Sequence, residues 1–88
     1  MSTTAAANAA NTIARNGADA EKFFQLGMMY STGNSVAADL VAAHKWFNIA
    51  AMRGSSEAAR LRREIASEMS EAEDAAAQRA ARVWLTRH

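Results

Sequence analysis

Few residues in this chain could carry chemistry. The 88 residues include no cysteine and only two histidines, His44 and His88. Without cysteine there is no disulfide, no thiolate metal site and no cysteine nucleophile, and two histidines alone make no recognisable metal-binding set. His44 falls at the border of the expected core face of its helix, with no carboxylate four residues away to orient it. We therefore interpret His44 as a packed boundary residue and His88 as a solvent-exposed chain end.

The acidic residues are the next candidates for chemistry. Glu64 and Glu68 share a helix face, as a carboxylate pair for general acid–base catalysis would. Arg60 precedes Glu64 by four residues, however, which is the spacing of an exposed helical ion pair. No nucleophile triad and no glycine-rich phosphate loop is present. The sequence therefore predicts a protein that is not an enzyme, with no catalytic residue, no metal and no cofactor.

Two arginine clusters could bind nucleic acid. Acidic residues are interleaved with them, Trp84 is the only aromatic residue nearby, and the net charge of the whole chain is only +1. A small nucleic-acid-associated regulator is therefore the alternative function rather than the leading one. Its binding residues would be Arg60, Arg62, Arg63, Arg79 and Arg82.

The elements that must position these residues are all expected to be helices. The chain is rich in alanine and has no proline, and both features favour helix. Breaker residues at 17, 31–35, 54–56 and 70 divide it into about five helices, over about 4–16, 20–30, 40–53, 56–68 and from 71 onward. Asp39 is expected to cap the third helix, and Ser70 with Glu73 forms a capping box at the start of the fifth. The sequence predicts an all-α fold.

Apolar spacing indicates which faces are buried. Small residues in the second and third helices, with Gly27 facing Ala50 and Ala51, would let the two backbones approach closely. Two such helices joined by a tight turn form an antiparallel hairpin. In the fifth helix the expected buried stripe is Ala72, Ala76, Ala80, Val83 and Trp84.

The second helix also carries a candidate partner-binding surface. Phe24 and Met28 lie on a face next to the core stripe, with Gln25 and Met29 at its margin. Core packing against neighbouring helices would explain these residues. An exposed apolar ridge would instead mark an interaction site, and methionine suits an adaptable surface because it is flexible and polarizable.

The central part of the chain resembles a known repeat. More than ten positions of one pattern fall in register here without a gap. They include Leu26, Gly27, Tyr30, Gly33, Asp39, Ala43, Trp46, Phe47, Ala50, Ala51 and Gly54. Over residues 20–58 this pattern resembles the Sel-one-like repeat, a relative of the tetratricopeptide repeat, and the stretch 39–51 looks especially like copies in small bacterial proteins of that family. One departure is Ser35, which stands where the second loop glycine of the pattern usually lies.

The resemblance implies an architecture and a role. The architecture is a fragment of an α-solenoid made of stacked antiparallel helix hairpins: an N-terminal helix or arm over 1–19, the repeat over 20–58, and degenerate or capping helices over 59–88. The role is a non-enzymatic adaptor or scaffold that binds another protein. Because solenoids need about three repeats for stability, a homodimer that completes the core is left open.

The sequence predicts no membrane partner. It has no signal for secretion and no long apolar stretch, so the expected location is the cytoplasm.

Overall fold

The computed structural model describes residues 19–88, and this part of the chain is helical. Residues 19–32 are helical and are followed by α2 (Leu40–Met52), α3 (Ser56–Ala66) and α4 (Glu71–Arg87). No strand occurs within 19–88, which confirms the all-α prediction for these residues. Four of the five expected helices are thus present, and the one expected over about 4–16 lies outside the described residues, as does nearly all of the expected N-terminal unit 1–19.

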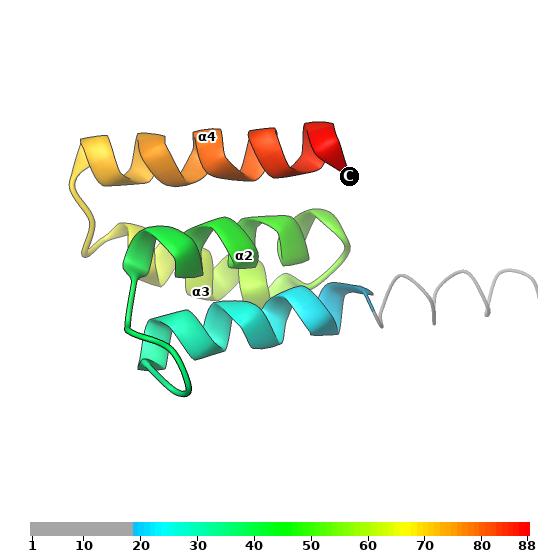
Figure 1. Cartoon of the computed structure of the whole chain (residues 1–88), viewed down its shortest axis with the longest axis horizontal. Helices are drawn as coiled ribbons and strands as arrows, with labels where there is room; N and C mark the ends of the chain where they lie inside the picture. The colour runs from blue at the N-terminus through cyan, green and yellow to red at the C-terminus, as the bar shows by residue number, and fades with distance from the viewer. Residues whose placement is uncertain (1–18) are drawn as a thin grey trace, which may run out of the picture.

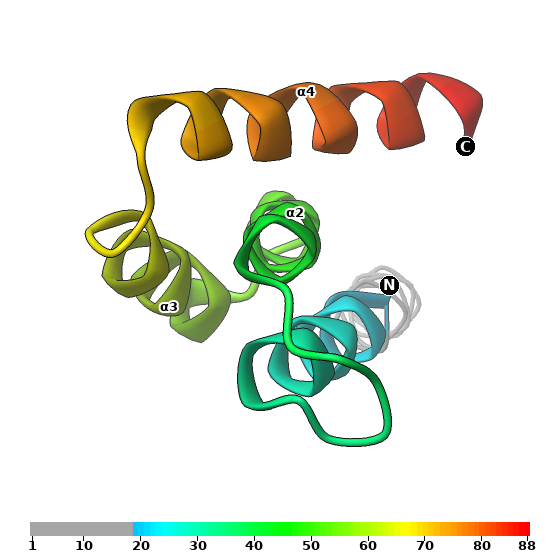
Figure 2. The same cartoon turned by 60° about the vertical axis from the view of Figure 1, so that its left-hand side comes forward.

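Helix α2 lies at the centre of the arrangement. The 19–32 helix and α3 run beside it on different sides, and α4 crosses over it (Figures 1 and 2). Both α3 and α4 make extensive contact with α2. This arrangement buries one face of each outer helix against α2. Four helices packed in this way do not by themselves establish a repeating solenoid.

The ends of α2 follow the local sequence signals. The side chain of Asp39 accepts a hydrogen bond from the backbone N–H of Ala42 at 3.1 Å, as an N-cap should. At the other end Gly54 has φ +109°, and the N–H groups of Gly54 and Ser55 donate back to Ala51 and Ala50. This Schellman arrangement satisfies the last carbonyls of the helix and requires a residue that tolerates positive φ.

The core is small and is centred on two large side chains of α2. Phe47 and Ile49 are the largest fully buried residues, and Ala43 and Ala50 of the same helix are buried beside them. Ala58 and Ile65 bring α3 into this core. The alanines allow the helices to pack closely around a few bulky residues.

Helix α4 buries a different face from the one that the sequence pattern predicts. Ala77 and Ala81 are its buried residues, whereas Ala72 is exposed and Val83 is 50% exposed. The predicted stripe is therefore wrong at Ala72 and Val83, whereas Trp84, its last member, does pack against the core. Alanines lie on several faces of this helix, and its rotation is decided by which larger side chains reach α2, among them Trp84.

The loop before α2 contains two residues in the left-handed backbone region. Gly33 has φ +75° and Ser35 has φ +71°. Ser35 adopts this backbone at a steric cost that glycine would avoid.

Within residues 19–88, no helix is both long and apolar enough to cross a membrane.

Candidate functional site

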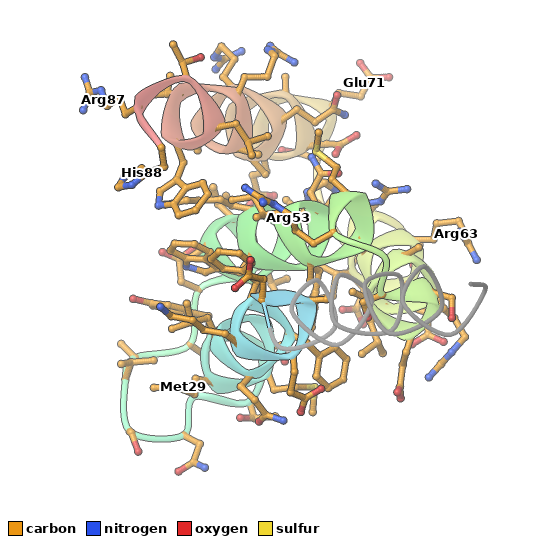
Figure 3. The ribbon with its side chains drawn as sticks, turned by 90° about the vertical axis from the view of Figure 1, so that its right-hand side faces the viewer. Met29, Arg53, Arg63, Glu71, Arg87 and His88 are labelled. Atoms are coloured by element: carbon orange, nitrogen blue, oxygen red, sulfur yellow. The ribbon has the colours of Figure 1, made fainter. Side chains whose placement is uncertain are left out.

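The predicted partner-binding residues of the first described helix lie partly at the surface. Phe24 and Met28 are half-buried and pack against the core, with the Phe24 ring centroid 5.8 Å from that of Phe47. Gln25 is exposed and donates to the Glu21 carboxylate at 2.7 Å. Met29 is half-buried and lies beside the loop that leads to α2 (Figure 3). The structure thus brings these residues together on one helix, with both core contact and exposed surface.

The neighbouring face of the same helix is covered by aromatic side chains. Phe23 stacks on Trp46 at 5.8 Å between ring centroids, with an interplanar angle of 5°. Trp84 meets both rings edge-on, at 5.0 Å from Phe23 and 5.6 Å from Trp46. This cluster ties the 19–32 helix and α4 to α2. It is structural, and it occupies the side of the helix next to Phe24 and Met28.

Gly27 marks the closest approach of two helices. A Cβ atom at this position would lie 2.5 Å from Cδ1 and Cε1 of Phe47. The sequence pattern predicts instead that Gly27 faces Ala50 and Ala51. The close packing is therefore confirmed, but the side chain that requires it is the Phe47 ring.

A second group of residues, which includes His44, lies where α2, α3 and α4 meet. The imidazole is buried, with 4% of the residue exposed, and its Nε2 lies 3.2 Å from Oδ1 of Asp74 in the first turn of α4. Gln78, one turn further along α4, donates to the same oxygen at 3.3 Å. Among residues 19–88, Nδ1 of His44 finds no hydrogen-bond partner. His44 is thus more deeply buried than the sequence predicts, and the carboxylate that orients it comes from a distant helix.

The surroundings of His44 favour its neutral form. Burial lowers the pKa of His44 below its usual value of 6.5; the Asp74 carboxylate raises it, and the nearby Arg62 guanidinium lowers it again. Asp74 is an acceptor when ionised, so the contact favours the tautomer that carries its proton on Nε2. Nδ1 then keeps an unshared lone pair in a buried position.

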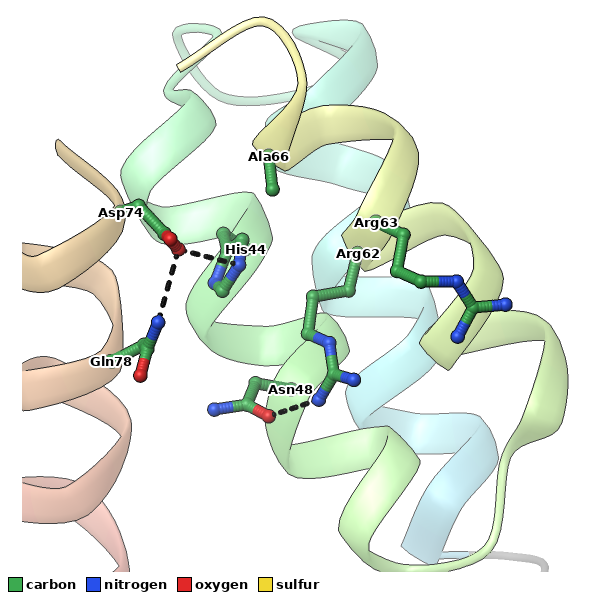
Figure 4. Close-up of a pocket in the computed structure, with 7 residues that line it drawn as sticks. All are labelled: His44, Asn48, Arg62, Arg63, Ala66, Asp74 and Gln78. Carbon is green, nitrogen blue, oxygen red and sulfur yellow. Dashed lines mark hydrogen bonds and ion pairs between the residues drawn. The ribbon is translucent and has the colours of Figure 1, made fainter. Parts of the chain in front are cut away.

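These residues line a cavity between three helices. The cavity has a volume of about 340 Å³, and its opposite side is formed by α3. There the Arg62 guanidinium donates to the Asn48 side chain of α2 at 2.7 Å (Figure 4). The lining residues are His44, Asn48, Arg62, Arg63, Ala66, Asp74 and Gln78.

The two arginine clusters lie on α3 and α4 and line different hollows. Arg60 is exposed and pairs within α3, at 3.4 Å to Glu57 and 2.9 Å to Glu64. This confirms the interpretation of Glu64 as part of a solvated charged face. Arg79 and Arg82 lie on α4 beside the exposed Val83, in a shallow hollow of their own. The clusters are thus separate features on different helices.

Sequence reasoning missed the polar cavity because its parts are far apart in the chain. Asp74 is thirty positions from His44, so no local spacing connects the two. The only local signals were a lone histidine beside a core stripe and three acidic residues in the first turn of α4. Acidic residues there are already explained by the helix dipole.

Comparisons with protein-family models, with curated proteins and with solved structures found no match to this chain.

Proposed function

We propose that this protein is a non-enzymatic protein-interaction module that binds another protein through the 19–32 helix. The surface that we assign to this role consists of Phe24, Gln25, Met28 and Met29. Its mechanism is the presentation of an adaptable apolar surface on a helix that the rest of the fold holds in place. An adaptor or scaffold of Sel-one-like repeat type is the function that the resemblance implies.

One observation carries this proposal. Phe24, Met28 and Met29 are large apolar side chains of one helix that remain partly exposed, although Phe23 and Gly27 of the same helix are buried. Leaving apolar area in water costs free energy that a partner could recover at about 25 cal/mol per Å². Methionine at two of the three positions lets such a surface adapt to its partner.

The loop geometry supports the resemblance on which the adaptor role rests. The repeat pattern has glycine at two positions of the loop, and Gly33 and Ser35 are the matching residues here. Both adopt positive φ, +75° and +71°. Ser35 thus adopts positive φ at the position where the pattern has glycine, the residue that adopts it most easily.

Site-specific photocrosslinking in the native cell tests the proposal. A photoreactive amino acid replaces Met29 in one variant and Arg60, an exposed residue of α3, in the control variant. We expect position 29 to form a protein adduct that nuclease treatment leaves intact and position 60 to form none. A nuclease-sensitive adduct, equal adducts at both positions, or no adduct at position 29 would each contradict the proposal.

Substitutions then test which residues make the surface. Phe24→Asp and Met28→Asp should abolish the adduct while circular dichroism shows that the helices survive. Because both residues touch the core, Gln25→Arg serves as a further variant: its side chain is exposed, so it should weaken the adduct and leave the melting temperature unchanged. If the adduct is undiminished in all folded variants, the partner does not bind through these residues. An adduct of twice the chain mass would identify a second copy as the partner.

A further inference from the structure

The cavity beside His44 contains opposite charges that do not pair with each other. Arg62 on α3 and Asp74 on α4 both line it, yet no ion pair within 4 Å joins them. One N–H of the Arg62 guanidinium donates to the side-chain oxygen of Asn48 at 2.7 Å. The described contacts of the Asp74 carboxylate all go to Oδ1, which leaves Oδ2 as a further acceptor. The cavity therefore offers donors at one side and an acceptor at the other.

A purely structural role explains only part of this group. The contact between His44 and Asp74 helps to fix α4 against α2, and a buried polar pair can serve that purpose alone. It does not explain Nδ1 of His44, which is buried without a hydrogen-bond partner among residues 19–88. Buried polar atoms in folded proteins are nearly always satisfied.

The size and charge of the cavity indicate the class of ligand. Its volume of about 340 Å³ is at the lower end of the range of about 300–1,000 Å³ for small-molecule sites. Arg62 reaches toward the other lining residues, whereas the Arg63 side chain extends toward the outside and adds its charge only at the margin (Figure 4). Inside the cavity the remaining N–H groups of Arg62 are therefore the donors for a ligand. A guanidinium binds anionic oxygens most strongly, so an anion is favoured with Arg62 as its principal donor.

Asp74 adds a second requirement. An ionised carboxylate accepts hydrogen bonds and donates none, so an anion that approaches it must bring a donor of its own. A ligand with both an anionic oxygen and a hydroxyl group satisfies the two sides of the cavity together.

We propose that this cavity binds a small anion that carries its own hydroxyl group, with Arg62 donating to the anionic oxygens and Asp74 accepting from the hydroxyl. Hydrogen phosphate and small hydroxycarboxylates share this chemistry. The inference is independent of the protein-interaction surface, which lies on a different helix, and each can fail without the other.

Two matched pairs of anions test the proposal at pH 7.5 and constant ionic strength. The first pair is hydrogen phosphate and sulfate, and the second is glycolate and acetate; only the first member of each pair carries a hydroxyl group. Each is titrated into the full-length protein and followed by the ¹H–¹⁵N resonances of the cavity residues. We expect saturable shifts for the hydroxylated member of at least one pair, with an affinity about tenfold or more above that of its partner. Preference for phosphate alone or for glycolate alone would tell which of the two classes is bound.

Variants assign the two roles to their residues. Arg62→Ala should weaken binding by about tenfold or more, whereas Arg60→Ala, which removes an exposed arginine of the same helix outside the cavity, should leave it unchanged. Asn48→Ala removes the protein partner of Arg62 but not its charge, so binding should persist. Asp74→Asn can donate as well as accept, so it should bring the affinities of the two members of a pair to near equality. Circular dichroism verifies that each variant is folded.

Several results would overturn the proposal. Shifts that grow linearly without saturation would show an ion atmosphere and no site. The proposal would also be overturned if Arg62→Ala and Arg60→Ala lost the same affinity. It would likewise be overturned if the parent protein bound both members of both pairs with equal affinity.

Discussion

Replacement of Gly27 by alanine tests whether close helix packing holds this fold together. In an exposed helix this change would stabilise the protein by about 1 kcal/mol, because alanine is the better helix former. Here the new Cβ would lie 2.5 Å from two carbons of the Phe47 ring, which is itself 1% exposed and has little room to move. Overpacking of this kind costs about 1–3 kcal/mol and occasionally more. A contact this short puts the packing cost at the upper end of that range, about 3 kcal/mol, against a gain of about 1 kcal/mol from helix propensity. We therefore expect a net loss of about 2 kcal/mol.

Urea denaturation followed by tryptophan fluorescence and by circular dichroism measures this loss. A loss of this size lowers the urea concentration at the unfolding midpoint by about 1 M for a small domain. Gln25→Ala is the matched control, since it changes an exposed residue of the same helix and should stay within about 0.5 kcal/mol of the parent. An unchanged or higher midpoint in Gly27→Ala would refute the packing argument.

A double-mutant cycle identifies the residue responsible. Phe47→Leu replaces the rigid ring by a smaller and more flexible side chain. If the ring is what Gly27 accommodates, the double variant should be more stable than the sum of the two single losses predicts, by about 0.5 kcal/mol or more. Additive losses would show that Gly27 and Phe47 do not interact.

Local signals in the sequence predicted the helices and their ends well. The Asp39 cap, the turn at Gly54 and the capping box of Ser70 with Glu73 are each present in the structure. Each depends on residues within four positions of one another, so no knowledge of the tertiary fold is needed. The end of α3 differs slightly: the helix stops at Ala66 rather than near 68, because residues 67–69 form a turn that leads to the α4 cap.

Rotation of a helix is harder to predict when alanine dominates it. Helix α4 has alanines on several faces, so the apolar pattern gives no single preferred side. Its orientation is decided by contacts with α2: Trp84 joins the aromatic cluster, and Asp74 meets His44. Both contacts join residues far apart in the chain. The polar cavity follows from this rotation, and for that reason it could not be predicted from spacing alone.

Three further changes probe the other features of the fold. Ser35→Gly should stabilise the protein by about 1 kcal/mol in urea denaturation, because serine is held at φ +71°; a loss of stability would contradict that backbone. Trp46→Ala should cost about 3 kcal/mol through its stacking on Phe23 and its edge contact with Trp84, and an unchanged midpoint would show that the cluster adds nothing. The third change is pH. Burial lowers the pKa of His44 in the folded protein below 6.5, so the unfolded chain binds a proton more readily. The contribution of His44 is therefore fully present above pH 6.5 and is lost as the pH falls through the lower folded pKa. Urea midpoints measured between pH 5 and 8 should fall toward acid in the parent and less steeply in His44→Gln, whereas equal slopes would mean that another group controls the acid response.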